Sequence, residues 1–265
     1  MKKQIFLFYI IGLILCVSIS CTRSNTENKN TDNSVEEVNN NHLINATLWV
    51  KLSQEYKANC YQAFNLAKMA LDKNLETASK EKPAGVILDI DETVLDNSEF
   101  QARLIKNNIA YNSNLWTEWV NEAIAKPIPG AIEFLNYAKS KNVEVLYITN
   151  RKTIEEKATI KNMKELGFPN TSENYEKYFK FKMPSDTGKE SRRQEYLKTY
   201  DIILYIGDNL ADFEKIYEEN NRNNQDATAS RIKEYLGTKY IILPNPMYGD
   251  WETKEIKENR IEALK

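Results

Sequence analysis

Two aspartates follow an apolar run in the segment AGVILDIDETVLDNSEF, which covers residues 84–100. Residues 86–88 have the apolar composition of a buried parallel strand, and Asp89 and Asp91 come directly after it. Because side chains alternate along an extended chain, residues two apart point to the same side. In α/β folds, ligands bind in the crevice at the carboxyl ends of the strands. We therefore expect both carboxylates to face a ligand there.

Two further predicted strands end in polar residues in the same way. The strand predicted at residues 143–149 ends at Thr149 and is followed by Asn150. The strand predicted at residues 202–206 is followed by Asp208 and Asp212. Lys189 begins the helix predicted between these two strands. Any one of these residues could simply cap a helix. Three such strand ends in order, with a lysine between the second and the third, favour a single shared site.

This set of residue types suits phosphoryl transfer. Convergent carboxylates repel one another, so they favour a bound divalent cation, and oxygen ligands favour magnesium over zinc. One carboxylate can attack phosphorus in line, and its neighbour can exchange protons with the leaving oxygen and with water. Hydroxyl and amide groups at Thr149 and Asn150, with the charge of Lys189, match the oxygens of a phosphoryl group.

Several phosphoryl-transfer mechanisms are excluded because the sequence lacks the residues that they need. His42 is the only histidine, and we expect it to lie in a solvated linker, which excludes a phosphohistidine route. Leu66 stands six residues after Cys60, where a cysteine phosphatase would need arginine. No GxxxxGK[ST] loop is present, which argues against a nucleotide-driven kinase or ATPase. An aspartate nucleophile is the phosphoryl-transfer route that remains.

The elements around these residues alternate between strands and helices, which predicts an α/β fold with a parallel sheet flanked by helices. Residues 48–78 have the spacing of a long helix or helix pair, with Cys60 as a buried structural thiol. Residues 98–128, between the first two strands, predict a small, mostly helical cap. We also expect helices at 131–140, 154–166 and 189–200, a helix containing Asp212, a short strand near 178–181, a polar loop at 220–229 and a strand at 240–243.

Residues 1–20 have the pattern of a secretory signal peptide, with two lysines, an apolar run over residues 5–17 and small residues before Cys21. The run is shorter than the roughly 20 residues of a spanning helix. Residues 18–21 resemble the lipobox of bacterial lipoproteins, which predicts lipidation of Cys21. Cleavage by ordinary signal peptidase at the same bond, giving a soluble periplasmic or secreted protein, is the alternative. Residues 21–45 are polar enough to form a disordered tether.

The folded domain is expected over residues 46–265. The whole 265-residue chain carries 36 Lys and Arg against 38 Asp and Glu, so no basic excess indicates a nucleic-acid polymer as partner. Cys16 lies in the leader and Cys21 is the residue expected to be lipidated, so Cys60 is the only ordinary thiol expected in the mature protein and no internal disulfide is expected. The sequence leaves the oligomeric state open, with a homodimer as one candidate.

Four motifs resemble those of the haloacid-dehalogenase (HAD) superfamily. They are DIDET at 89–93, ITN at 148–150, Lys189, and GDNLADF at 207–213. The longer forms DxDETxLDNS, YxTNR and LPNPMYGDWE resemble the class C acid phosphatases, which are bacterial lipoprotein acid phosphatases and 5'-nucleotidases. The resemblance covers roughly residues 46–251 and implies a HAD-like, Rossmannoid sheet.

The resemblance also implies roles for individual residues. It makes Asp89 the nucleophile and Asp91 the general acid and base. Magnesium would be bound by Asp89, the Asp91 backbone carbonyl and Asp208, with Asp212 holding a metal-bound water. Thr149, Asn150 and Lys189 would bind the phosphoryl group, although Lys180 and Lys182 are nearby alternatives to Lys189.

Trp116 and Tyr248 match positions that hold a nucleobase in this family, with core packing as the alternative and Trp119 and Trp251 as other packing candidates. The expected activity is magnesium-dependent hydrolysis of phosphomonoesters, such as nucleoside 5'-monophosphates, outside the cytoplasm and favoured below neutral pH. A membrane-anchored lipoprotein, in the outer membrane, is the expected form. A dehalogenase is a competing enzyme, disfavoured by Asp91. The alternative from another class is a surface lipoprotein that binds haem or a host ligand on a HAD scaffold.

Overall fold

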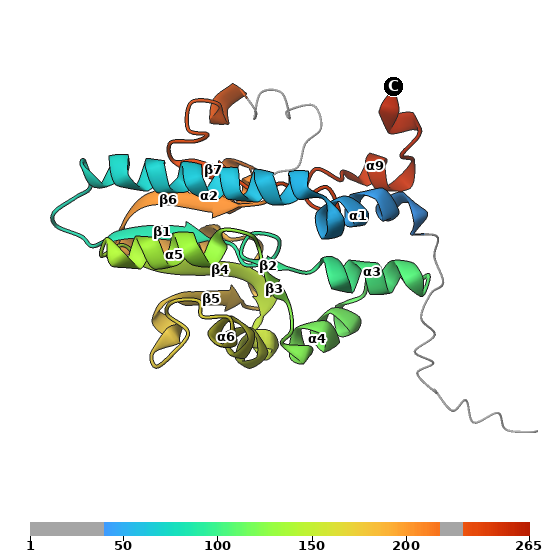
Figure 1. Cartoon of the computed structure of the whole chain (residues 1–265), viewed down its shortest axis with the longest axis horizontal. Helices are drawn as coiled ribbons and strands as arrows, with labels where there is room; N and C mark the ends of the chain where they lie inside the picture. Colours follow the sequence, from blue (N-terminus) through green and yellow to red (C-terminus); the bar gives the residue numbers. More distant parts are fainter. Residues whose placement is uncertain (1–39, 218–229) are drawn as a thin grey trace, which may run out of the picture. The chain divides into compact units, whose positions relative to one another are not determined.

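A five-stranded parallel sheet forms the centre of the fold, in the order β5-β4-β1-β6-β7 (Figure 1). The structure is a computed structural model and describes residues 40–217 and 230–265. The strands are β1 (Ala84–Leu88), β4 (Glu144–Lys152), β5 (Phe179–Lys182), β6 (Asp201–Gly207) and β7 (Tyr240–Ile242). The predicted α/β fold with a parallel sheet is confirmed.

Both faces of the sheet are buried, and alternate residues of one strand enter different cores. Val86 and Leu88 of β1 pack into the larger core, whereas Ile87 packs into the smaller one. The larger core lies under α2 (Gln54–Leu75) and α5 (Ala131–Ser140), and the smaller one lies under α7 (Glu190–Thr199). This double burial explains why the strands are nearly continuous apolar runs.

Of the two forms predicted for the N-terminal helical stretch, a long helix or a helix pair, the structure has the pair. Ser53 ends α1 (Ile44–Leu52) in an extended conformation, and its Oγ accepts a hydrogen bond from Tyr56 N at the start of α2. The apolar spacing therefore does not continue through the break. Leu48 and Leu52 are exposed, whereas Cys60 is fully buried in the larger core, as predicted.

The predicted cap region lies between β1 and α5. It contains β2 (Leu95–Asp96), α3 (Ser98–Lys106), α4 (Ser113–Glu122) and β3 (Lys126–Pro127), and β2 and β3 pair antiparallel. Figure 1 shows α3 and α4 beyond the carboxyl ends of the parallel strands, beside α1 and α9 (Lys254–Glu258). These helices surround the edge of the sheet where the aspartates were expected.

The other elements connect these parts. They are α6 (Glu156–Glu165) and the 3-10 turns η1 (Asn41–Leu43), η2 (Thr153–Glu155), η3 (Tyr175–Lys177), η4 (Leu210–Asp212), η5 (Lys215–Tyr217) and η7 (Glu262–Leu264).

Three sequence predictions were wrong in detail. The strand expected to end at Thr149 continues as β4 to Lys152, so Asn150 belongs to the strand. Asp212 lies in the 3-10 turn η4, because its carboxylate turns back to the Asn209 backbone and closes the turn. The tether predicted to reach residue 45 ends earlier, since Asn40 is buried and donates to the carbonyl of Ile109 over 2.7 Å.

Several predictions lie outside the described residues, namely the signal peptide, lipidation at Cys21, most of the tether and the polar loop at 220–229. Among the residues that the structure describes, no helix has the length and apolar character needed to span a membrane.

Candidate active site

A cavity of about 560 Å³ opens at the carboxyl ends of the central strands. This size falls within the range of roughly 300 to 1,000 Å³ that is typical of small-molecule sites. Eight of the predicted site residues line it, namely Asp89, Asp91, Trp116, Asn150, Lys189, Asp208, Asp212 and Tyr248. Thr149 is the exception, because it is fully buried, and its Oγ1 accepts a hydrogen bond from Arg151 N over 3.0 Å.

Lys189 lies between two of the aspartates. Its Nζ is 2.5 Å from Asp89 Oδ1 and 2.6 Å from Asp212 Oδ1, and all three side chains are at least nine-tenths buried. Asp89 follows β1, Asp212 lies on η4, and Lys189 immediately precedes α7, so three separate elements deliver these groups. Lys180, one of the alternatives to Lys189, instead pairs with Glu195 over 2.6 Å.

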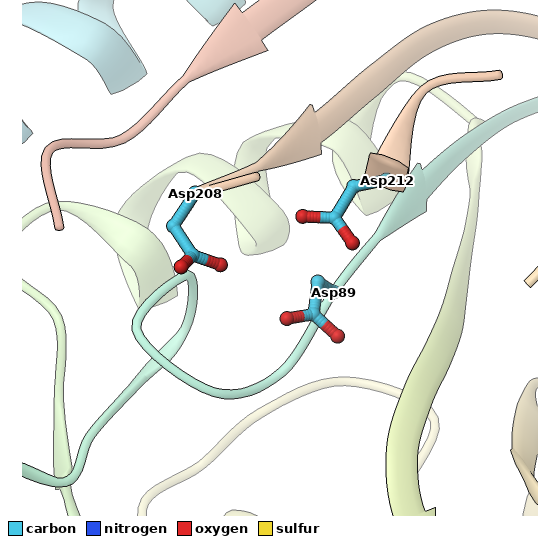
Figure 2. Close-up of side chains that lie close together, drawn as sticks. All are labelled: Asp89, Asp208 and Asp212. Atoms are coloured by element: carbon cyan, nitrogen blue, oxygen red, sulfur yellow. The ribbon is translucent and has the colours of Figure 1, made fainter. Parts of the chain in front are cut away.

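Asp208 completes a cluster of three carboxylates with Asp89 and Asp212 (Figure 2). One oxygen from each residue lies within 4.8 Å of the others. Asp208 is held by the amide of Asn245 at 2.9 Å and by the hydroxyl of Thr93 at 3.3 Å. A Cβ at Gly207 would stand 2.3 Å from Asp212 Oδ2, so a glycine is needed for the turn to bring Asp212 this close.

Burial and the charges of neighbouring residues shift the pKa values of the residues in this cluster. Burial, supported by Asp212 and Asp91 and opposed by Lys189, raises the pKa of Asp89 to about 7. Burial followed by the charges of Asp212 and Asp89 raises the pKa of Asp208 well above its ordinary value. For Lys189, burial would lower the pKa, but the two neighbouring aspartates outweigh it and raise the pKa.

The donor set fits a divalent cation. When all three carboxylates of the cluster are ionised, Lys189 balances only one of their charges, which leaves two negative charges in a buried space. A hard divalent cation with oxygen ligands would balance that excess. Asp89, Asp208 and Asp212 are the described residues whose oxygens are grouped closely enough to hold such an ion.

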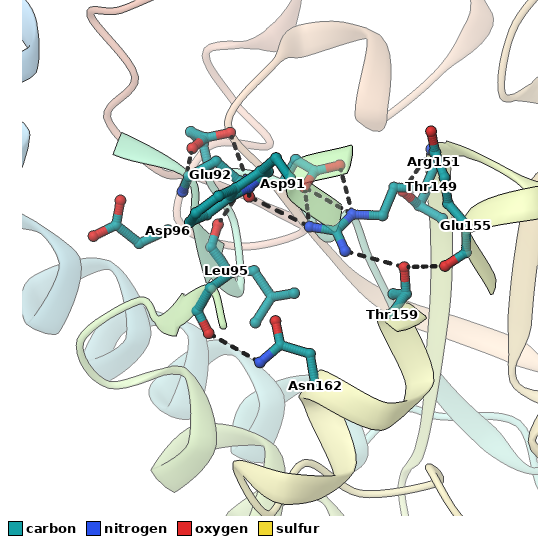
Figure 3. Close-up of polar contacts among 12 residues, drawn as sticks. Asp91, Glu92, Leu95, Asp96, Thr149, Arg151, Glu155, Thr159 and Asn162 are labelled. Atoms are coloured by element: carbon teal, nitrogen blue, oxygen red, sulfur yellow. Dashed lines mark hydrogen bonds and ion pairs between the residues drawn. The ribbon is translucent and has the colours of Figure 1, made fainter. Parts of the chain in front are cut away.

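Asp91 has different partners from Asp89 (Figure 3). Its Oδ1 is 2.7 Å from Arg151 Nη2 and 3.0 Å from Arg151 Nε, and it accepts a hydrogen bond from Asn97 Nδ2 over 2.9 Å. Arg151 is itself 1% exposed and also donates to Thr159 Oγ1 at 3.0 Å. The Asp91 carboxylate is therefore held in a charge pair with a buried arginine.

Glu92 joins the loop after β1 to the C-terminal loop. It is buried, has a left-handed backbone with φ of 55°, and accepts hydrogen bonds from the Asn97 backbone at 2.9 Å and from the Tyr248 hydroxyl. Burial, followed by the charges of Asp91 and Asp208, raises the pKa of Glu92 well above its ordinary value. Because Tyr248 lines the cavity, Glu92 fixes one side of its wall.

Aromatic side chains form another wall. Trp116 and Phe100 line the cavity and meet edge to face with ring centroids 5.3 Å apart. Trp119 is 3% exposed in the core and donates through Nε1 to Asn97 at 2.8 Å, which confirms it as a packing residue. Trp251 is 45% exposed and does not belong to either core. Trp116 and Tyr248 pack against the larger core and also line the cavity, as do Phe100 and Tyr111.

Sequence reasoning missed the supporting residues of the site, Arg151, Glu92, Asn97 and Phe100. Arg151, Glu92 and Asn97 are letters of the motifs YxTNR and DxDETxLDNS, which is the signal that the sequence offers for them, whereas Phe100 lies outside both motifs. Their partners lie up to 156 positions away in the chain, as in the Tyr248–Glu92 hydrogen bond. Only the folded structure shows these pairings.

This chain is similar to a known family and to solved structures of one of its members. The family model HAD superfamily, subfamily IIIB (Acid phosphatase), matches residues 13–251. The structure of the class C acid phosphatase from Bacillus anthracis is 39% identical in sequence with a TM-score of 0.76, and the match covers 82% of this chain and 89% of that one. The same Bacillus anthracis enzyme is also matched in a crystal structure with tungstate bound, at the same identity and TM-score.

Curated relatives are more distant. The stem 28 kDa glycoprotein of Glycine max is 26% identical over 134 residues, which are 48% of this chain and 51% of that protein. A stem 31 kDa glycoprotein of the same plant is 25% identical over 165 residues, 61% of this chain and 58% of that protein. The chain thus spans about half the length of these curated relatives.

Proposed function

Because the chain belongs to the acid phosphatases of the HAD superfamily, subfamily IIIB, we propose that it is a magnesium-dependent phosphomonoesterase acting through an aspartyl-phosphate intermediate. The observation that carries this proposal is the group formed in the cavity by the buried Asp89, Asp212 and Lys189 and the half-buried Asp208. It combines a carboxylate nucleophile with cation ligands and a fixed positive charge.

Asp89 is the proposed nucleophile. Its carboxylate attacks phosphorus, the bond to the ester oxygen breaks, and the phosphoryl group is transferred to Asp89. Lys189 binds the phosphoryl oxygens from the side of α7, and Asn150 binds them from the end of β4. Thr149 is the third proposed phosphate ligand; it is buried beneath this surface and its Oγ1 accepts a hydrogen bond from Arg151 N, so its hydroxyl proton is the group that would donate to the ester. Asp89, the Asp91 backbone carbonyl and Asp208 would hold magnesium, with Asp212 beside them, and the bound ion would neutralise charge on the transferred group.

Asp91 is the proposed proton carrier. It lines the cavity two residues from the nucleophile, so it can serve the leaving oxygen in the first step and the attacking water in the second. Arg151 and Asn97 fix the resting position of its carboxylate. Proton transfer by Asp91 then requires a substrate oxygen to displace part of this pair.

The proposed substrates are nucleoside 5'-monophosphates and similar small esters. Trp116 and Tyr248 line the same cavity as the carboxylates, which places aromatic surface within the space that a bound ester would fill. Stacking of a base on aromatic rings contributes about 1 to 3 kcal/mol and tolerates different bases. We expect broad base specificity.

We also propose that the protein is exported and attached to the outer membrane through a lipid on Cys21, where it would act on esters outside the cytoplasm. Support comes from the leader-like composition of residues 1–20 and the small residues before Cys21. Metabolic labelling with a fatty acid tests this. Label on the native protein but not on a Cys21→Ser variant is expected, whereas equal label on both would reject the anchor.

The function is tested by phosphate release from p-nitrophenyl phosphate and from a panel of nucleoside 5'-monophosphates. Release that requires magnesium and stops with EDTA is expected. Release from p-nitrophenyl phosphate alone would reject the nucleotide substrates but keep the phosphatase. No chelator-sensitive release from any ester would reject the enzyme and favour the binding lipoprotein.

A further inference from the structure

Arg192 is a buried arginine in the first turn of α7 that does not line the cavity. Its side chain is 5% exposed and lies three residues after Lys189. Burying an unpaired guanidinium charge would greatly lower the stability of the fold, so a buried arginine needs partners. The groups that Arg192 contacts therefore indicate its role.

Two of these partners belong to the end of β4. Arg192 Nη2 donates to Asn150 Oδ1 over 3.1 Å, and Nη1 donates to the Thr149 carbonyl oxygen. A guanidinium has only hydrogen-bond donors, so the part of the Asn150 amide that faces it must be the oxygen. The amide NH2 of Asn150 is then left for the cavity, which Asn150 lines. An NH2 group is the half of the amide that can donate to phosphoryl oxygens.

The remaining contacts of Arg192 hold the guanidinium itself in place. Nη2 donates to the Gly188 carbonyl at 3.1 Å, Nη1 donates to the Lys180 carbonyl at 3.3 Å, and Nε is 3.2 Å from Asp186 Oδ2. These groups come from β5 and the loop before α7, so the donor that faces Asn150 has a fixed direction.

The next residue on the same helix offers a matched contrast. Arg193 is 2% exposed, and its Nη1 donates to the Ala211 carbonyl at 2.7 Å, while Nε and Nη2 contact Glu190 at 3.0 and 2.9 Å. Ala211 lies beside Asp212, so Arg193 supports the turn that carries the carboxylate cluster. Two adjacent, equally buried arginines therefore contact different halves of the site.

We propose that Arg192 is a positioning residue that orients the Asn150 amide so that its NH2 group binds the phosphoryl oxygens of the substrate. The inference rests on the proposed phosphatase function and adds a residue that acts through Asn150 without touching the ester. Arg193, by contrast, supports the cation ligands.

The first test compares Arg192→Lys with Arg193→Lys in the full chain. The measurements are kcat and KM for p-nitrophenyl phosphate, the inhibition constant of inorganic phosphate, and the magnesium concentration for half-maximal activity. Arg192→Lys should raise the phosphate inhibition constant about tenfold and leave the magnesium requirement unchanged. Arg193→Lys should mainly raise the magnesium requirement. An unchanged phosphate constant in Arg192→Lys, or equal shifts of both quantities in both variants, would overturn the proposal.

A second test keeps Arg192 intact, in case its variant does not fold. Asn150→Asp would still accept a hydrogen bond from Arg192 but would present an oxygen to the phosphoryl group. It should therefore bind inorganic phosphate more weakly than Asn150→Ala does. Tighter binding by Asn150→Asp than by Asn150→Ala, or equal binding, would show that the NH2 group does not face the ligand. Hydrolysis by the unmodified protein, measured alongside, tests the proposed function separately.

Discussion

Asp89 and Asp91 are two residues apart, yet the fold gives them opposite surroundings. Asp89 lies with two other carboxylates and a single lysine, so its region carries excess negative charge. Asp91 lies in a one-to-one pair with Arg151, with Asn97 as a further donor. The comparison shows that partners from distant elements, rather than the local sequence, give two similar carboxylates different charge environments, which is what the proposed roles of nucleophile and proton carrier require.

The largest expected effect concerns the nucleophile. Asp89→Asn should lower the rate of phosphate release at saturating magnesium by at least about 10⁴-fold, because removing a catalytic nucleophile costs this much in other hydrolases. Circular dichroism should show an intact fold. If Asp89→Asn retained a tenth of the activity, Asp89 would not be the nucleophile, and the proposed difference in role between Asp89 and Asp91 would be wrong.

The second effect is smaller because the role proposed for Asp91 is proton transfer alone. Asp91→Asn should lower kcat about 10²- to 10⁴-fold, the usual contribution of general acid–base catalysis, and leave the magnesium requirement nearly unchanged. Activity measured against magnesium concentration checks both statements. A large rise in the magnesium requirement would place the Asp91 side chain in the cation site.

Stability should change in opposite directions in the two variants. In EDTA above neutral pH, Asp89→Asn removes one of several repelling buried charges and should raise the free energy of unfolding. Asp91→Asn leaves Arg151, which is 1% exposed, without its carboxylate and should lower that free energy by about 1 to 3 kcal/mol. Urea unfolding of both variants checks the signs. If Asp89→Asn and Asp91→Asn were destabilised equally, the excess negative charge around Asp89 and the one-to-one pairing of Asp91 with Arg151 would both be contradicted.

The smallest effect is the pH dependence of the metal-free protein. The pKa of Asp89 is about 7 in the fold against an ordinary value of 3.8, so between these values the folded state binds more protons than the unfolded state. The free energy of unfolding therefore falls as pH rises through this window. In EDTA, the melting temperature should drop by at least about 3 °C between pH 5 and pH 8, and magnesium should reverse the drop. A melting temperature that rises over this range would contradict the raised pKa.

The strands and their polar ends were predictable because buried parallel strands are continuous apolar runs and polar residues follow them. β1, β4 and β6 therefore appear close to their predicted positions, and Asp89, Lys189 and Asp208 meet at one edge. The spacing within residues 48–78 could not show the break at Ser53, since a serine fits both a helix interior and a helix start.

The supporting shell was not predictable for a different reason. Arg192 resembles an ordinary surface charge in the sequence, and Arg151 stands out only as the last residue of the YxTNR motif. Their distant partners, Asn150 and Asp91, show that both arginines are buried at the site. The sequence also could not show which tryptophan packs in the core. In the structure Trp119 belongs to the larger core, whereas Trp116 lines the cavity.

The most direct test of the account is to mix the enzyme with a ³²P-labelled nucleoside 5'-monophosphate and magnesium and to quench the reaction with acid within milliseconds. We predict a protein-bound phosphoryl group that hydroxylamine removes, as expected for an acyl phosphate on Asp89, and that does not form in Asp89→Asn. Rapid turnover with no label on the protein, or label that persists in Asp89→Asn, would contradict the claim that Asp89 is the nucleophile.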